Sequence, residues 1–391
     1  MSDTIAAPAR SLAQRLAVMT QIHLPGTVGR ILKQNRDIEA IAPFFKQSGL
    51  VRFYRVPERL DLKVSGIATS VSTRPVWGGL LYASAAVRVD LAVEDSLIRT
   101  TGQDSACEID DIDYEDQWKR FQLIGVRQAY QMASAAVRGP DRPDLILMDC
   151  PLVLNRSMVP TGEAAENLGY RRAYDNAITE IARFWTGNQA LLFPWNPQGT
   201  VIASLASERF GAIVYVAQQD LRTVDGRQHL LGTEEVDYEK VRHLVDSQPA
   251  ISSVGVRRFL HGILEKQTRT AAFRMNIKTP RMEPAEVAAG GVIGFHMRAV
   301  DQNAPQLVQL IGDAPGWTKE RLDRLAGEIT SFTVSNGNQP VPIPLFLASQ
   351  IAETIPNFVD AYRSGVEDQI RKRQLETDWL TGIEDFHPEN E

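Results

Sequence analysis

Asp149 is the residue whose type and position are best suited to chemistry, because it directly follows the apolar run Leu145–Met148. Such a run indicates a strand that is buried on both faces of a sheet. A carboxylate at the end of such a strand commonly meets a metal ion or a substrate at the sheet edge. Asp149 is therefore a candidate catalytic residue and metal ligand, which would hold Mg²⁺ or Mn²⁺ and orient a water toward a phosphodiester. The alternative is structural: the carboxylate caps the turn that Cys150 and Pro151 shape.

Basic residues are densest between residues 257 and 281, where aromatic side chains and a methionine are interleaved with them. Such a mixture favours a path for nucleic acid, because cations neutralise phosphates and aromatic rings stack on bases. The commoner explanation for a helix–strand segment of this length is a solvated face. The candidate nucleic-acid contacts are Arg257, Arg258, Arg269, Arg274 and Lys278.

Two further segments have compositions that suit a ligand. The acidic segment 104–116 resembles a cation site, but it lacks the residue order of an EF-hand loop. We expect it to be a solvated loop that leads into a helix, since acids are favoured at a helix N-terminus. The turn 196–200 precedes a predicted helix, whose N–H groups would suit a phosphate. Turn and capping chemistry is the simpler explanation of that turn.

Composition and missing motifs exclude several classes of protein. The formal net charge of −6 argues against a free-standing, non-specific nucleic-acid binder, although it leaves room for a local basic surface. The sequence contains no phosphate-binding loop, dinucleotide fingerprint, nucleophile elbow or zincin motif. Two cysteines and six scattered histidines supply neither a disulfide framework nor a clustered zinc site. The N-terminus lacks the apolar core of a secretory signal, and no apolar run is long enough to span a membrane. We expect a cytoplasmic protein without membrane contact.

The elements that position these residues follow from hydrophobic periodicity. Residues 1–50 are predicted to form helices separated at Pro25 and Gly26. Strands are predicted at 51–56, 60–71, 78–93, 145–149, 190–195, 212–217, 270–278, 291–299 and 305–312, and helices at 118–137, 162–186, 200–210, 254–266, 319–331 and 346–375. Antiparallel strands followed by β-α-β units indicate an α/β, ribonuclease-H-like mixed sheet flanked by helices. The predicted domains are a helical N-terminal extension (1–50), a nuclease-fold domain (51–375) and an acidic tail (376–391).

Three stretches in this order resemble the NurA nuclease family, whose members work on DNA ends beside a HerA-type hexameric ATPase. Residues 66–90 resemble its strand ending in Asp-Gly-Ser and the hairpin strand that follows. The helix 118–137 with the strand 144–154 resembles its helix and its strand ending in Leu-Asp-Gly-Ser-Leu. Residues 339–353 are similar to its closing Pro-x-Pro-Leu segment, which runs into a helix carrying Ala-His. The resemblance covers about residues 50–365.

The resemblance also shows where this sequence departs from the family. The family's first metal-binding aspartate falls at Ala68, and only Asp149 keeps the acid of the second. The family's helix-borne glutamate, its lysine and its closing histidine fall on positions occupied here by Gln128 or Gln131, by Gln218 and by Ser349. Alanine, amide and hydroxyl side chains are poor substitutes for anionic ligands of a divalent metal. A shifted alignment would let Asp61 or Asp90 supply the missing acid.

The resemblance implies a NurA-like subunit for DNA end processing and repair that acts on DNA as a homodimer beside a HerA-like ATPase. The side-chain losses predict weak or absent nuclease activity. One alternative is an active metal-dependent DNA nuclease of the 5′–3′ end-resection type, with Mn²⁺ or Mg²⁺ at Asp149. Another is a non-catalytic scaffold or interaction protein, and a third is a small-molecule enzyme that uses the turn 196–200.

Overall fold

The computed structural model describes residues 11–76, 79–95, 97–152, 154, 156–205, 230–237, 240, 254–275, 291–301, 303–312, 316–336 and 339–373. The predicted strand 212–217 and the predicted tail 376–391 lie outside the described residues, as do Gln218 and Lys278.

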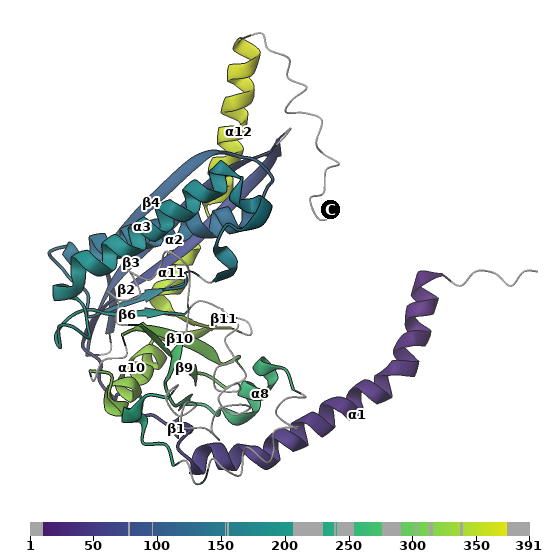
Figure 1. The fold of residues 1–391 in the computed structure, drawn as a ribbon, viewed down its shortest axis with the longest axis vertical. Coiled ribbons are helices and arrows are strands. Elements are labelled where there is room, and N and C mark those ends of the chain that lie inside the picture. Colours follow the sequence, from purple (N-terminus) through teal and green to yellow (C-terminus); the bar gives the residue numbers. More distant parts are fainter. Residues whose placement is uncertain are drawn as a thin grey trace, which may run out of the picture.

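One large mixed sheet organises the fold (Figure 1). In the described part of the chain its strand order is β1-β7-β9-β10-β6-β5-β2-β3-β4, and β8 pairs with β9. The strands are β1 (Val51–Phe53), β2 (Leu62–Val76), β3 (Gly79–Glu94), β4 (Leu97–Ile112), β5 (Leu145–Met148), β6 (Val201–Ser204), β7 (Thr268–Thr270), β8 (Phe273–Met275), β9 (Val292–Arg298) and β10 (Gln306–Ile311). The central β5 pairs in parallel with β2 and β6, whereas the remaining ladders are antiparallel. This arrangement confirms the predicted α/β mixed sheet.

Helices cover both faces of the sheet because the central strands are apolar on both sides. The helices are α1 (Leu12–Gln47), α2 (Gln117–Arg138), α3 (Leu168–Asn188), α8 (Val256–Ile263), α10 (Lys319–Ser331), α11 (Ile343–Ala352) and α12 (Ile355–Lys372). Ile67 and Ile146 belong to the buried cluster that contains α2 and α3 residues. The alternate residues Ala68 and Leu147 belong to the cluster that contains α10, α11 and α12 residues. A two-stranded ladder of β11 (Thr333–Asn336) and β12 (Gln339–Pro342) precedes α11.

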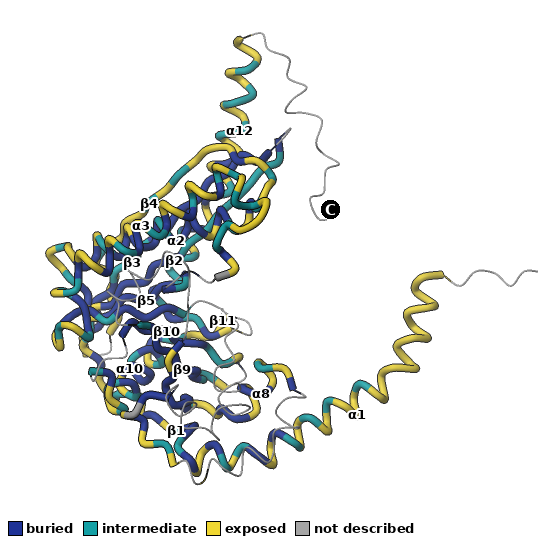
Figure 2. The backbone as a smooth tube through the Cα atoms, in the orientation of Figure 1, coloured by how far each residue is buried: buried dark blue, intermediate teal, exposed yellow. Residues whose placement is uncertain are grey.

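The N-terminal extension is one long helix, α1, that projects from the body of the protein (Figure 1). Ser11 and Gln14 form a capping box at its start, and Pro25 lies inside it, so the expected break into two helices is wrong. Ile38 and Phe45, near its end, are buried, and the ring of Phe45 contacts Phe259 of α8. The first part of α1 is exposed, as Figure 2 shows.

Four other predicted elements are wrong. Residues 104–112 belong to the edge strand β4 and not to a loop, because their backbone pairs with β3. Acids suit an exposed edge strand because they discourage pairing with another chain. The strand after α3 is β6, whereas residues 190–195 form a 3₁₀ turn, a single bridge from Leu192 to Thr200, and a further turn. The N–H of Val201 donates to the carbonyl of Asp144, which starts the parallel pairing with β5 where a helix was expected. The single helix expected over 346–375 is the pair α11 and α12.

Candidate functional site

Asp149 lies where β5 ends beside β2, as its position after the apolar run predicted. The two strands are paired as far as Ile67 and Met148, and the N–H of Asp149 donates to the carbonyl of Ile67 at 3.1 Å. The Asp149 carboxylate then turns back to β2. Its Oδ2 accepts from the N–H of Thr69 at 2.7 Å, and its Oδ1 accepts from the Thr69 hydroxyl at 3.1 Å. Both carboxylate oxygens therefore extend the ladder between the strands.

Burial raises the pKa of Asp149 to about 6, because an ionised carboxylate is poorly solvated there. The two hydrogen bonds from Thr69 act in the opposite direction, because they stabilise the ionised form. Above this pKa the Asp149 carboxylate is ionised, and it accepts hydrogen bonds from the N–H and the hydroxyl of Thr69, which are both neutral.

Asp149→Asn is expected to stabilise the protein near neutral pH in the presence of a metal chelator. The folded-state pKa of about 6 lies above the ordinary value of 3.8, so folding favours the protonated carboxyl. That stability is present below about pH 4 and is lost as the pH rises through about 6. Denaturant unfolding at about pH 3.5 should show little difference, whereas at about pH 7.5 asparagine should gain roughly 1–3 kcal/mol. Asp141→Asn is the control because the Asp141 side chain is 87% exposed. Equal or lower stability of Asp149→Asn at the higher pH would contradict this account.

Position 68, where the family's first aspartate falls, is apolar and closed. Ala68 is 1% exposed and belongs to the buried cluster that includes Leu345 and Ala348 of α11. The helix lies directly on β2, since a Cβ at Gly66 would come within 2.3 Å of the Pro344 carbonyl carbon. Position 68 is therefore filled by core packing and offers no ligand to a metal ion.

The other departing positions make contacts of their own. Gln128 is buried, and its Oε1 accepts from the Ser84 hydroxyl at 2.9 Å, while its Nε2 donates to the Ser84 carbonyl at 3.4 Å. The Ser349 hydroxyl donates to the Phe346 carbonyl within α11 at 2.8 Å. Gln131 is exposed. Amide and hydroxyl groups engaged in this way do not act as anionic metal ligands.

Neither alternative carboxylate lies at Asp149. Asp90 pairs with Ser65 on β2, four residues before Thr69, which is about 13 Å along the strand. Its Oδ1 accepts from the Ser65 hydroxyl at 2.5 Å. Asp61 precedes β2 and accepts from the N–H of Asp95 at 2.8 Å. The described residues contain no group of three or more His, Cys, Asp or Glu side chains that could hold a metal ion. This donor set does not fit Mg²⁺ or Mn²⁺, which prefer several carboxylates or carbonyls.

The predicted basic segment is divided by the structure. Arg269 is fully buried, and its guanidinium pairs with Glu234 at 2.7 Å and Asp323 at 2.6 Å, so its prediction as a nucleic-acid contact is wrong. Sequence alone could not show that these distant acids surround it. Arg257 and Arg258 are exposed on α8, and Arg274 is exposed on β8.

Helix α1 adds basic residues that the sequence analysis missed. α8 packs beside the end of α1, and Arg258 donates a hydrogen bond to Gln34 (Figure 1). Arg30 lies one turn before Gln34, and Lys33 lies next to it. We call Arg30, Lys33, Arg257 and Arg258 the α1–α8 basic surface. The sequence does carry a sign of this surface, since residues 12–36 contain four basic residues and no acid.

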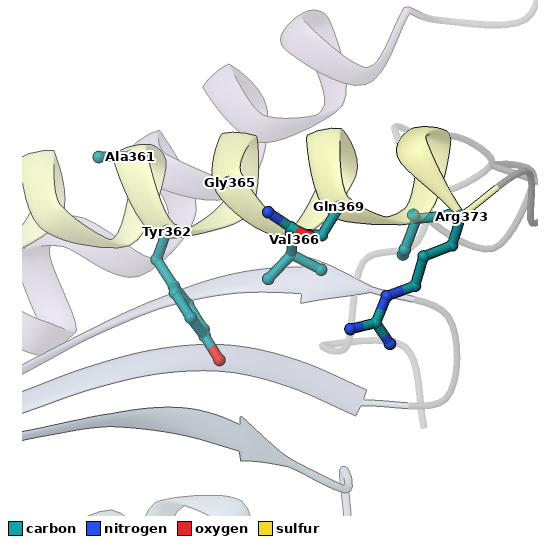
Figure 3. Close-up of a pocket in the computed structure, with 7 residues that line it drawn as sticks. Ala361, Tyr362, Gly365, Val366, Gln369 and Arg373 are labelled. Carbon is teal, nitrogen blue, oxygen red and sulfur yellow. The ribbon is translucent and has the colours of Figure 1, made fainter.

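Asp149 lines neither of two cavities formed by the described residues. One of about 560 Å³ runs along α12, where Figure 3 shows Tyr362 and Val366 on the side that faces the strands. Another of about 380 Å³ lies between β3, β4 and the junction of α11 and α12. Its lining includes Val87, which pairs with Ala68, so an apolar cavity borders the position of the family's first aspartate.

No helix in the described part of the chain has the length and apolar character needed to cross a membrane.

Comparison with solved structures identifies the fold. The chain matches the NurA nuclease from Sulfolobus solfataricus with a TM-score of 0.55 and 14% identity, over 95% of this chain and 99% of that chain. A further NurA structure matches with a TM-score of 0.43 and 13% identity, over 88% of this chain and 97% of that one. A NurA structure with manganese matches with a TM-score of 0.42 and 13% identity, over 90% and 98%. The fold assignment depends on the first match alone. Searches of protein-family models and of curated proteins found no match. The chain has a NurA-like, ribonuclease-H-like fold.

Proposed function

We propose that this chain, with its NurA-like fold, is a DNA-processing subunit whose own nuclease activity is weak or absent. The observation that carries the proposal is the pairing of Asp149 with Thr69 beside an apolar position 68. The nuclease scaffold is kept, whereas the ligands of a metal site are replaced by hydrogen bonds and packing. In this proposal residues 51–375 form the nuclease-fold domain and α1 is an appended arm.

Metal-dependent hydrolysis is the less favoured function. Two-metal chemistry places its ions about 3.5–4 Å apart and therefore needs several anionic ligands around them. The described residues bring no group of three or more His, Cys, Asp or Glu side chains together, so Asp149 lacks the set of anionic ligands that this chemistry requires. An active nuclease of the 5′–3′ end-resection type, using Mn²⁺ or Mg²⁺, is therefore the alternative and not the conclusion.

The proposed contact with DNA is the α1–α8 basic surface. Its four cations are exposed and come from two helices that pack together. Cations in such a surface neutralise phosphates without reading sequence. A local basic surface is compatible with a net charge of −6, because net charge does not determine how the charges are distributed.

Arg257→Ala together with Arg258→Ala is expected to weaken binding of linear DNA by roughly tenfold and to lower the salt slope of log K by about 2. Each arginine would lose one phosphate contact. Fluorescence anisotropy across a salt series measures both quantities. Arg171→Ala with Arg172→Ala is the matched control, since both residues are exposed on α3 and the charge change is the same. An equal loss in the control would show that net charge, and not this surface, determines affinity.

The apolar residues of α1 are proposed to contact a protein. Leu12 is 74% exposed, Ile22 is 63% exposed and Leu16 is 57% exposed, although each is a large apolar side chain. Exposed apolar patches of this kind mark protein interaction sites. We propose that a second copy of the chain covers them, that the dimer acts in the cytoplasm, and that a HerA-like hexameric ATPase supplies the motor.

A further inference from the structure

We propose that a second site on this chain, a pocket at the N-terminal ends of β2 and β5, binds a phosphate group of a nucleic-acid strand. The pocket has a volume of about 530 Å³. Its charged lining consists of Lys63 from β2, Arg138 from the end of α2 and Arg142 from the loop before β5. The identity of the ligand as nucleic acid rests on the proposed function, whereas its phosphate chemistry rests on the pocket itself.

Arg138 is held in position by a buried residue. Its Nε donates to Oδ1 of Asn188 at 2.8 Å. Asn188 is 1% exposed, and its Nδ2 donates to the Phe184 carbonyl at 2.8 Å, which fixes the amide. The terminal nitrogens of Arg138 make no hydrogen bond or ion pair with the residues that the structure describes. The guanidinium is therefore oriented, and its two terminal nitrogens have four N–H donors left for a ligand.

Arg142 lies in a loop that is anchored on both sides. Prolines flank it at positions 140 and 143 and restrict the backbone there. The Thr200 hydroxyl donates to the Pro143 carbonyl at 2.6 Å, which ties the loop to the start of β6. Within the described ranges, Arg142 makes no hydrogen bond or ion pair. Because Arg142 is held by a restrained loop and its guanidinium has no partner among the described residues, it is suited to bind an anionic ligand.

The acids around the pocket leave both guanidinium groups available. Lys63 Nζ pairs with Asp141 at 3.3 Å, but the two side chains are 55% and 87% exposed, so the pair exchanges readily. Asp144 accepts from the N–H of Lys63 at 2.9 Å, which directs its carboxylate to the strand end. Three cations thus face two carboxylates. Paired guanidinium groups match the oxygen geometry of phosphate.

This pocket is separate from Asp149. Lys63 precedes Thr69 by six residues on β2, which corresponds to about 20 Å. The pocket therefore lies at the opposite end of the parallel strands from the carboxylate. It would hold a strand at a distance from the position where a NurA-like fold is expected to perform chemistry.

The test compares binding of a short 5′-phosphorylated single strand, the same strand without the phosphate, and inorganic phosphate. Arg138→Ala with Arg142→Ala is expected to weaken binding of the strands about tenfold and to lower the salt slope by about 1. Arg142→Ala alone, which removes no contact seen within the described residues, should lose about threefold. The control, Arg171→Ala with Arg172→Ala, should change affinity less than twofold. A larger loss for the phosphorylated strand than for the unphosphorylated one would assign the pocket to a strand end. Equal losses for both strands would assign it to an internal phosphate.

Unchanged binding in the double variant, with the wild type binding DNA, would overturn the pocket but leave the proposed function standing. Failure of the proposed function without failure of the pocket would give a different result. If the wild type binds no strand, while inorganic phosphate raises its melting temperature and the double variant loses that rise, the pocket stands and the proposed function falls. If the wild type binds neither strand nor phosphate, both fail.

Discussion

Arg269→Met is expected to lower the free energy of unfolding by about 3–5 kcal/mol, because it removes the fully buried partner of Glu234 and leaves that carboxylate with the longer ion pair to Arg52 at 3.5 Å. The Arg269 and Glu234 side chains are both fully buried. The guanidinium also donates to Asp323 at 2.6 Å and to the Thr270 carbonyl at 3.0 Å. Glu234 accepts from the N–H of Ala272 at 2.8 Å, so the pair joins residues 232–234, β7, the link between β7 and β8, and α10. Methionine replaces the volume but none of these hydrogen bonds.

Chemical denaturation of wild type, Arg269→Met, Glu234→Gln and the double variant measures this effect. We expect the double variant to be less destabilised than the sum of the single variants, since the glutamine leaves no buried charge behind. Arg257→Met is the control, because Arg257 is exposed on α8. A loss below about 1 kcal/mol in Arg269→Met would contradict burial of this ion pair.

Ala68→Asp is expected to destabilise the protein by roughly 3–5 kcal/mol when no divalent metal is present. The new carboxylate would be buried under α11 and would lie beside Asp149, since the parallel ladder of β2 and β5 ends at Ile67 and Met148. Two neighbouring carboxylates without a cation repel each other. A divalent cation bound between them would favour the folded state and recover part of the loss.

Thermal unfolding of Ala68→Asp with a chelator and with millimolar Mn²⁺ tests this prediction. Ala86→Asp is the matched control, because Ala86 is 0% exposed but belongs to the cluster on the other face of the sheet. We expect Mn²⁺ to raise the melting temperature of Ala68→Asp and not that of Ala86→Asp. Stability equal to wild type in the chelator would show that position 68 is not packed under α11. No response to Mn²⁺ would show that positions 68 and 149 do not form a cation site.

Local patterns in the sequence predicted the elements that carry Asp149. The apolar run before Asp149 indicated a strand buried on both faces, and the order of strands and helices indicated the mixed sheet. The sequence-based predictions were wrong where the backbone of a segment pairs with a strand that its composition does not reveal. β4 is acidic, yet its backbone pairs with β3 along its length. β6 was expected to be a helix until the parallel ladder with β5 showed its register.

The candidate site was predictable as a position but not as an environment. The sequence identified Asp149, and the resemblance pointed to position 68 and to position 128 or 131 as places without the family's acids, because residue types can be read directly. It could not show that Thr69 engages both oxygens of Asp149, since this requires the register of two strands 80 residues apart. Arg269 shows the same limit, because its partner Glu234 lies 35 residues away in the chain.

A nuclease assay with Mg²⁺ and with Mn²⁺ on linear DNA, comparing wild type with Asp149→Ala, tests the central claim most directly. The claim is that the fold of a nuclease is retained without a working metal site. We predict that wild type and Asp149→Ala both cleave at the background rate, with or without a HerA-type ATPase. Metal-dependent cleavage by the wild type that Asp149→Ala abolishes would contradict the claim and show an active nuclease.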